Sequence, residues 1–176
     1  ANETRDCHMR EALGIDYMVA GSFASSHHGL PRATNDADIV VDPSPRALDD
    51  LVTALAADGY YADAGLAREA LRARRVFNVI DPDTAFKIDL IIRKERPFSR
   101  EEFLRRQRRD LGGLPVSIAT AEDTILSKLE WARKTGGSEQ QLADASGVVQ
   151  VCGDRLDRDY LEKWAAVLGV LDLWLL

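Results

Sequence analysis

Residues 21–42 read GSFASSHHGLPRATNDADIVVD and connect two stretches that are typical of β-strands. The apolar run Tyr17–Ala20 precedes them and predicts a short buried strand that closes at the Gly-Ser pair. Residues 23–28 predict a helix, which must end near Gly29 because Pro31 disfavours helical geometry in the residue before it. This part of the chain therefore predicts a strand, a tight turn and a short helix in succession.

Residues 36–42 alternate between two kinds of side chain. In an extended strand one face would carry Ala37, Ile39 and Val41, and the other would carry Asp36, Asp38, Val40 and Asp42. The alternation predicts a strand buried on one face, and its high apolar content predicts a central place in a sheet.

A hairpin follows further along the chain. Residues 76–80 and 86–92 are rich in β-forming residues and flank a typical turn sequence at 81–84, Asp-Pro-Asp-Thr. Residues 3–13 predict a helix at the start of the chain. Capping signals predict further helices that begin near Ser44, Ser99, Thr120, Ser138 and Asp157.

This order of elements predicts an α+β fold, in which a mixed β-sheet with helices is followed by a helical C-terminal region. The glycines and proline within residues 112–120 predict a hinge. We therefore expect an α/β core over residues 1–112 and a helical region over 113–176, packed together as one compact unit.

Composition excludes several classes of protein. The 176 residues are 45% hydrophobic and 30% charged with a net charge of −6, which argues against a disordered chain and against a general nucleic-acid coat. The longest apolar run, WAAVLGVLDLWLL, is too short for a membrane span and contains Asp172, so we expect no membrane association. Cys7 and Cys152 form neither a disulfide framework nor a metal motif, which favours the cytoplasm.

Three carboxylates are the strongest candidates for chemistry. Asp36 and Asp38 share a face of one strand, and two anions that close repel unless a cation lies between them. Asp89 stands among apolar neighbours in FKIDLII, residues 86–92. A solvated polar face and a satisfied structural aspartate are the alternative interpretations. If the three come together, they match the oxygen ligands that Mg²⁺ prefers.

Gly21 and Ser22 are the candidates for binding phosphate. They stand where a strand turns into a helix, and a helix start offers free N–H groups and the positive end of the helix dipole. An ordinary turn and helix cap is the alternative interpretation of this pair.

These motifs together resemble the nucleotidyltransferase superfamily that includes DNA polymerase beta. The shared pattern is an apolar residue before Gly-Gly or Gly-Ser, then Asp-x-Asp before an apolar residue, then a separate Asp between apolar residues. The string HG-x-PR-x-T-x-D-x-D, residues 28–38, is most similar to small bacterial proteins around the AbiEii-type toxin nucleotidyltransferases. The tail, residues 121–170, is also similar to uncharacterised members of that group.

The resemblance implies a reaction and a set of roles. A hydroxyl group would attack the α-phosphate of a nucleoside triphosphate, with two Mg²⁺ ions, or Mn²⁺, as cofactors. Asp36 and Asp38 would hold both metals, and Asp89 would complete the nucleophile-side metal and help to activate the hydroxyl. Gly21 and Ser22 would bind the triphosphate.

Two basic residues are further nucleotide-binding candidates. Lys128 lies on or beside the apolar stripe of its predicted helix, and related enzymes often place a phosphate-binding lysine there; a snorkelling lysine is the alternative. Arg32 could meet a phosphate or pair with an aspartate. Asp144 is a weaker candidate, because the basic residue that toxin relatives often carry one turn earlier is replaced here by the run Glu139-Gln140-Gln141.

His27 and His28 suggest a metal site of a hydrolase that would include the paired aspartates Asp36 and Asp38. Adjacent residues on a helix point about 100° apart, so both imidazoles cannot easily face one ion. We therefore rank a metal phosphohydrolase below the transferase.

Residues 93–109 contain eight basic and three acidic residues in an otherwise acidic chain. They predict either a solvated helix face with internal ion pairs or a dock for RNA or another polyanion. This basic segment and the toxin-like sequence motif at residues 28–38 favour a tRNA end as acceptor. A protein hydroxyl or a small molecule such as an aminoglycoside is the alternative acceptor. A catalytically inactive nucleotide- or partner-binding module, one half of a toxin–antitoxin pair with a small protein partner, is the competing hypothesis.

Overall fold

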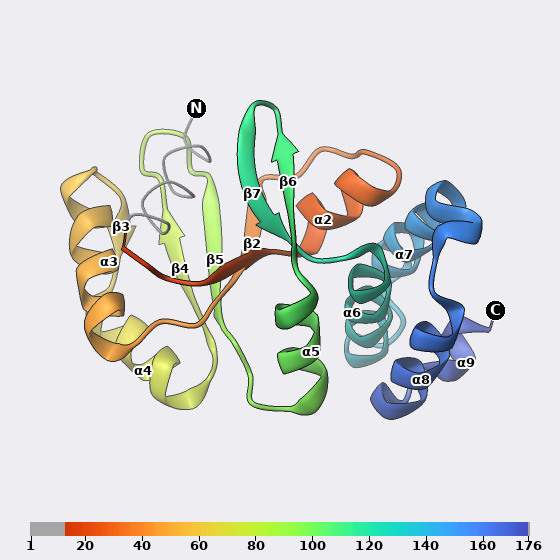
Figure 1. Ribbon diagram of the computed structural model, residues 1–176. Coiled ribbons are helices and arrows are strands. Elements are labelled where there is room, and N and C mark those ends of the chain that lie inside the picture. Colours follow the sequence, from red (N-terminus) through yellow and green to blue (C-terminus); the bar gives the residue numbers. More distant parts are fainter. Residues whose placement is uncertain (1–12, 176) are drawn as a thin grey trace. The chain divides into compact units, whose positions relative to one another are not determined.

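The computed structural model describes residues 13–175 (Figure 1). The helix predicted over residues 3–13 therefore lies outside the described part of the chain, apart from its last position. By the contacts between its residues, the described chain divides into two compact units, one over residues 13–19 and 35–118, the other over 20–34 and 119–175.

The first unit contains a seven-stranded mixed sheet in the order β3-β4-β5-β2-β1-β7-β6. Two of its neighbouring pairs, β2 with β5 and β1 with β7, are parallel, and the others are antiparallel. The strands are β1 (Tyr17–Val19), β2 (Asp36–Val41), β3 (Tyr61–Ala62), β4 (Val76–Ile80), β5 (Lys87–Ile92), β6 (Gln107–Leu111) and β7 (Leu114–Ile118). The expected α+β class, the central strand at 36–41 and the 76–92 hairpin are confirmed.

Among the described residues, three helices belong to this sheet unit: α3 (Pro45–Ala57), α4 (Ala64–Ala73) and α5 (Pro97–Arg105). Helices α3 and α4 pack against each other and next to β3 and β4 (Figure 1). Helix α3 starts where the sequence predicts, because the Ser44 hydroxyl accepts a hydrogen bond from the Ala47 N–H. The start predicted at Ser99 is wrong: Pro97 opens α5, and Ser99 is buried inside the helix, where its hydroxyl accepts a bond from Arg96 Nε.

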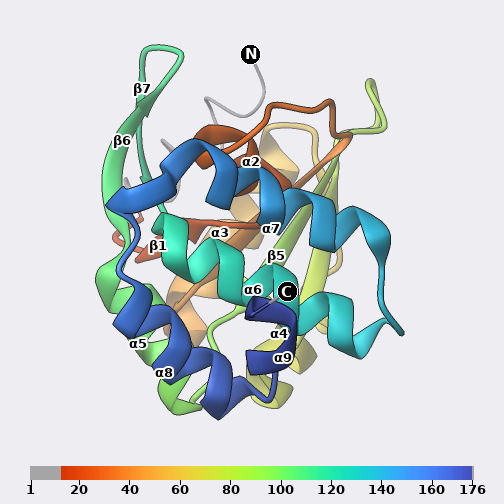
Figure 2. The same cartoon turned by 90° about the vertical axis from the view of Figure 1, so that its right-hand side faces the viewer.

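The second unit is helical. It contains α2 (Gly21–His28), α6 (Ala121–Lys134), α7 (Glu139–Cys152), the short 3₁₀ helix η1 (Gly153–Arg155), α8 (Arg158–Leu168) and α9 (Leu171–Trp174). Helices α2, α7 and α8 all pack against α6 (Figure 2). The predicted starts at Thr120 and Asp157 are confirmed by side-chain caps that accept N–H bonds from Asp123 and Tyr160.

The packing of α2 on α7 depends on a glycine at the end of α2. A Cβ atom added to Gly29 would lie 2.7 Å from the Val148 backbone nitrogen and 2.8 Å from the Gly147 carbonyl carbon. A larger residue at position 29 would therefore separate the two helices or distort one of them. The closeness of these backbones brings the loop that follows α2 next to α7.

The contact boundary between the two units does not lie at residue 112, where the boundary between core and helical region is expected. Gly112 and Gly113 have φ angles of 64° and 91° and form the turn of the β6–β7 hairpin. Positive φ angles at both central positions suit a two-residue hairpin loop, and the Gly113 N–H donates to Asp110 Oδ1 at 2.8 Å. The glycines of the expected hinge thus form a hairpin turn, while the contact boundary after Ile118 lies within the expected hinge region, residues 112–120.

No helix in the described residues is long and apolar enough to cross a lipid bilayer.

Candidate functional site

The pairing of two central strands places the three predicted carboxylates on one face of the sheet. Strands β2 and β5 run parallel, with Asp38 directly opposite Asp89 and Asp36 directly opposite Lys87. Asp36 lies two positions from Asp38 and therefore points to the same side. Along both strands this face is half-buried, whereas the alternate residues, such as Ile39 and Leu90, are fully buried.

Asp89 is held by two neighbours on this face. Its Oδ2 accepts a hydrogen bond from Lys87 Nζ at 3.0 Å, and its Oδ1 accepts one from Asn78 Nδ2 on β4. The hydrogen bond to Asp89 raises the pKa of Lys87, and the negative charges of Asp89, Asp36 and Asp38 raise it further against the opposing effect of burial. Lys87 is therefore a protonated ammonium group amid three carboxylates.

Sequence reasoning missed both Lys87 and Asn78. Lys87 could have been found, because residues two apart in a strand share a face and Lys87 precedes Asp89 by two. Asn78 could not, because its place opposite Asp89 depends on the register of the β4–β5 hairpin.

The three carboxylates Asp36, Asp38 and Asp89 form what we call the carboxylate face, which is the candidate site for a divalent cation. Within residues 13–175, no group of three or more His, Cys, Asp or Glu side chains converges closely enough to hold a metal as placed. The donor set nevertheless consists of three carboxylates on one face, the chemistry that Mg²⁺ and Mn²⁺ prefer, and an ammonium group lies against one of them as a stand-in cation. The chemistry of these side chains agrees with a divalent cation, and metal binding by Asp36, Asp38 and Asp89 stays a prediction.

The helical unit holds a second cluster, centred on Asp144 of α7. Its carboxylate accepts bonds from four side chains on four different segments: Arg32 Nε at 2.9 Å and Nη2 at 3.0 Å, Lys128 Nζ at 2.7 Å, Gln140 Nε2 at 2.9 Å and Ser25 Oγ at the longer distance of 3.5 Å. The side chains of Asp144 and Lys128 are each 5% exposed. Burial alone would raise the pKa of Asp144, but the hydrogen bonds from Arg32, Lys128 and Gln140 hold it well below its usual range.

We call this group the Asp144 cluster; it consists of Ser22, Arg32, Lys128, Gln140 and Asp144. It connects three of the predicted nucleotide-binding residues, Ser22, Arg32 and Lys128. Arg32 Nη2 also donates to Ser22 Oγ at 2.7 Å. The structural alternative for Arg32, pairing with an aspartate, is therefore observed, and its phosphate contact stays a prediction. Lys128 is turned into the protein and not toward solvent.

Gly21 opens α2 with a φ of 57°, a conformation that favours glycine over residues with a side chain. The preceding residue, Ala20, supplies no side-chain cap to the first turn. A backbone approach by a ligand at this turn agrees with these features, and phosphate binding by Gly21 and Ser22 remains a prediction.

His28 has a structural contact. Its Nε2 lies 2.7 Å from the Ala119 carbonyl oxygen, which can only accept, so Nε2 carries the proton. The His27 ring meets the His28 ring edge-on at 4.8 Å. This bond favours the structural interpretation of His28 over the hydrolase metal site.

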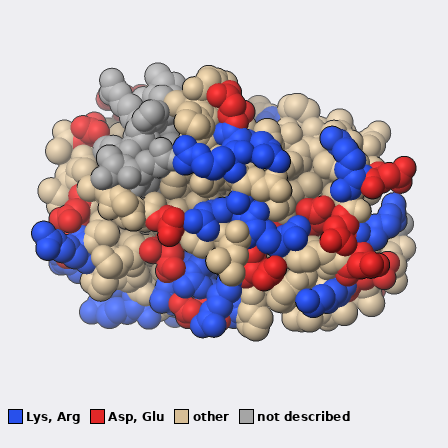
Figure 3. Space-filling model, in the orientation of Figure 1, with Lys and Arg blue, Asp and Glu red and all other residues tan. Residues whose placement is uncertain are grey.

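The basic segment 93–109 is not one helix face: it covers the loop after β5, helix α5 and the start of β6. Several of its arginines pair with acidic side chains of the same unit, as Arg93 does with Asp42 at 2.9 Å and Arg106 with Asp16 at 2.8 Å. Arg106 also lies over the Phe103 ring, 4.2 Å from its centroid. On the face drawn in Figure 3, basic and acidic side chains are interspersed. The positive charge of this segment is thus balanced in part within the protein.

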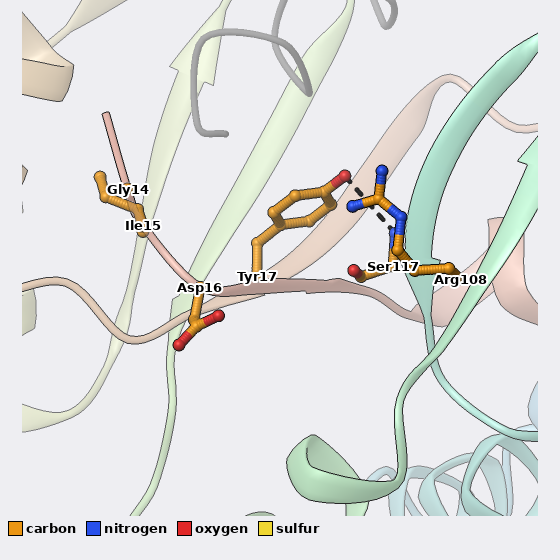
Figure 4. A pocket seen from close by; sticks show the side chains of 6 residues that line it. All are labelled: Gly14, Ile15, Asp16, Tyr17, Arg108 and Ser117. Atoms are coloured by element: carbon orange, nitrogen blue, oxygen red, sulfur yellow. Dashed lines mark hydrogen bonds between the residues drawn. The ribbon is translucent and has the colours of Figure 1, made fainter. Parts of the chain in front are cut away.

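A shallow pocket in the sheet unit is lined by Arg108 of the basic segment and by five residues outside the predicted sites. Figure 4 shows Tyr17 and Arg108 in it, and the Ser117 N–H donates to the Tyr17 hydroxyl at 3.4 Å. The lining comprises Gly14, Ile15, Asp16, Tyr17, Arg108 and Ser117. None of the predicted catalytic or nucleotide-binding residues belongs to it, so it adds nothing to the candidate site.

Comparison with solved structures identifies the fold. The crystal structure of ANT(2'')-Ia in complex with adenylyl-2''-tobramycin has a TM-score of 0.62 at 12% identity, covering 96% of this chain and 98% of that one. An antigenic nucleotidyltransferase-like protein from Paracoccidioides brasiliensis gives 0.56 at 14% identity, covering 97% and 90%. The solution structure of the antibiotic-resistance factor ANT(2'')-Ia gives 0.54 at 14% identity, covering 94% and 95%. The chain has a nucleotidyltransferase fold.

No protein-family profile and no curated protein sequence matches the chain. The predicted fold is therefore confirmed through structure alone. The narrower similarity to AbiEii-type toxins stays a prediction from the HG-x-PR-x-T-x-D-x-D string.

Proposed function

We propose that the protein is a Mg²⁺-dependent nucleotidyltransferase that moves a nucleoside monophosphate from a nucleoside triphosphate to an acceptor hydroxyl. One observation carries the proposal: Asp38 and Asp89 face each other across two parallel strands, with Asp36 on the same side, in a chain with a nucleotidyltransferase fold. Three carboxylates and one lysine form a strongly anionic face, which suits divalent cations and the phosphates that they bind.

The three carboxylates would have different roles in the reaction. Asp36 and Asp38 would hold both metal ions, and Asp89 would complete the site nearest to the acceptor hydroxyl. The bound ions supply positive charge that stabilises the transition state at the α-phosphate. Asp89 would orient the acceptor hydroxyl and accept its proton, and Asn78 would keep that carboxylate in place. The hydroxyl oxygen forms a bond to the α-phosphorus, and pyrophosphate leaves.

The nucleotide would be held by residues of the helical unit. Arg32 is 31% exposed and can be reached by a phosphate, whereas the buried Lys128 would act by fixing Asp144, which in turn fixes Arg32. Gly21 and Ser22 would contribute a backbone N–H and a hydroxyl. In this account Asp144 is a positioning residue, because it contacts Arg32 and Lys128 and not the reacting atoms.

The acceptor is the least determined part of the proposal. Internal pairing of Arg93, Arg100 and Arg106 weakens the argument for RNA docking on residues 93–109. The structure of ANT(2'')-Ia, which holds an adenylylated tobramycin, covers almost the same length of chain. We therefore place a small molecule with several hydroxyl groups first and a tRNA end second.

The proposal is tested by label transfer. The protein is incubated with Mg²⁺ and each nucleoside triphosphate labelled at the α-phosphate, and separately with an aminoglycoside panel, total tRNA and a cell lysate. We expect label on a small molecule, and label on tRNA would establish the second acceptor instead. Label on neither, in protein that binds the nucleotide, would contradict the transferase and favour the inactive binding module.

A further inference from the structure

Lys87 is the basic residue of the carboxylate face. No other Lys or Arg occurs in β1, β2, β4 or β5, all of which the structure describes in full. Three carboxylates on neighbouring positions of β2 and β5 therefore share one ammonium group from these central strands. Its backbone position is fixed by the sheet register, which sets Lys87 opposite Asp36 and two residues before Asp89.

Lys87 forms its hydrogen bond with one carboxylate of the face, that of Asp89. Its Nζ lies 3.0 Å from Asp89 Oδ2, while Asn78 takes the other oxygen. The Asp89 side chain is 20% exposed and that of Lys87 is 42% exposed. The lysine thus reaches the face from a more solvated place, and it can leave without breaking the apolar core.

The ion pair between Lys87 and Asp89 reduces charge repulsion on the face when no metal is bound. Three carboxylates on one half-buried face repel one another, and the Lys87 ammonium within hydrogen-bond distance of Asp89 lowers that repulsion. A divalent cation bound by the same carboxylates would meet the lysine as a like charge. Metal and lysine therefore compete for one anionic site.

We propose that Lys87 is the internal counter-ion of the carboxylate face, which stabilises the metal-free protein and is displaced from Asp89 when a divalent cation binds. The identity of the cation rests on the proposed function, whereas the counter-ion role does not. Lys87 is on this view a positioning residue that sets the affinity of the face for metal.

The test replaces Lys87 with Met, which keeps the length of the side chain and removes its charge. Lys94→Met is the matched control, because it makes the same change of net charge at an exposed residue five positions beyond Asp89. Binding of Mn²⁺ alone is measured by calorimetry, and the Tm is measured in EDTA and in Mg²⁺. Lys87→Arg, which restores the charge, serves as the rescue variant.

We expect Lys87→Met to bind Mn²⁺ about tenfold more tightly than wild type, because a like charge has left the site. Its Tm in EDTA should fall by roughly 3 °C, and Mg²⁺ should restore it. Lys94→Met and Lys87→Arg should match wild type in both measurements.

Two results would overturn the proposal. Equal Mn²⁺ affinity in Lys87→Met and Lys94→Met would show that lysine and metal do not compete. An unchanged Tm in EDTA would show that Lys87 does not stabilise the metal-free face. Asp38→Asn in the otherwise wild-type protein tests the metal site separately. If this variant binds Mn²⁺ as tightly as wild type, the metal site of the proposed function is refuted. The Tm of Lys87→Met in EDTA then still decides whether Lys87 is a counter-ion.

Discussion

Asp38→Asn is expected to lower nucleotidyl transfer about a thousandfold or more, with the fold intact. Asp38 faces Asp89 directly and would hold both metal ions, so the amide removes a negative charge from the centre of the site. The substitution keeps the size of the side chain, and the position is only half-buried, so little packing is lost. Initial rates of label transfer at saturating Mg²⁺ measure the effect.

The control for this variant is an aspartate outside the face. Asp49→Asn alters an exposed residue that pairs with Arg68 on the surface of α3, and it should leave the transfer rate unchanged. Circular dichroism and Tm establish that both variants are folded. Transfer that persists in folded Asp38→Asn within tenfold of wild type would refute the assignment of the metal face.

Asp144→Asn is expected to destabilise the protein by about 3–5 kcal/mol, the cost of breaking a buried ion pair from one side. The change leaves the buried ammonium of Lys128 without its carboxylate and removes the paired bonds from Arg32. Urea unfolding at neutral pH gives the free energy of unfolding.

Asp172→Asn is the matched control for Asp144→Asn. Asp172 also pairs with an arginine, Arg133, but its side chain is 65% exposed, so its loss should leave the free energy of unfolding close to that of wild type. Equal losses in the two variants would contradict the structural importance of the Asp144 cluster.

The effect of Asp144 should also depend on pH. The folded protein holds the pKa of Asp144 below the ordinary value near 3.9, so its carboxylate stabilises the fold fully at pH values above that ordinary pKa. As the pH falls from there toward the lower pKa of the folded state, this stabilisation is lost. The difference between wild type and Asp144→Asn should therefore be constant near pH 7 and shrink at about pH 3.

The local patterns of the sequence were sufficient for much of the fold. Alternation at residues 36–41 and the turn at 81–84 predicted β2 and the β4–β5 hairpin, because strand alternation and turn chemistry are local properties. Caps at Thr120 and Asp157 were predicted for the same reason. Strands β6 and β7 are not predicted by local patterns, because four of the five residues of β6 are polar or charged and the glycine turn of the hairpin resembles a hinge.

The candidate site was predicted in its residues but not in its contacts. The facing of Asp36, Asp38 and Asp89 follows from the parallel pairing of β2 with β5, which depends on strands far apart in the chain. The convergence of Arg32 and Lys128 on one carboxylate depends on the packing of α2, α6 and α7. Such contacts are properties of tertiary structure, and no periodicity in the sequence encodes them.

The most direct test of the central claim is the position at which the triphosphate is cleaved. The same nucleoside triphosphate is supplied with its label either at the α-phosphate or at the γ-phosphate, and the products formed with Mg²⁺ and acceptor are separated. We predict that the α label appears on the acceptor and that the γ label leaves in pyrophosphate, both only in protein with Asp38 intact. Label from the γ-phosphate on the acceptor, or released as free phosphate without transfer, would contradict the account and indicate a phosphoryl transferase or a phosphohydrolase.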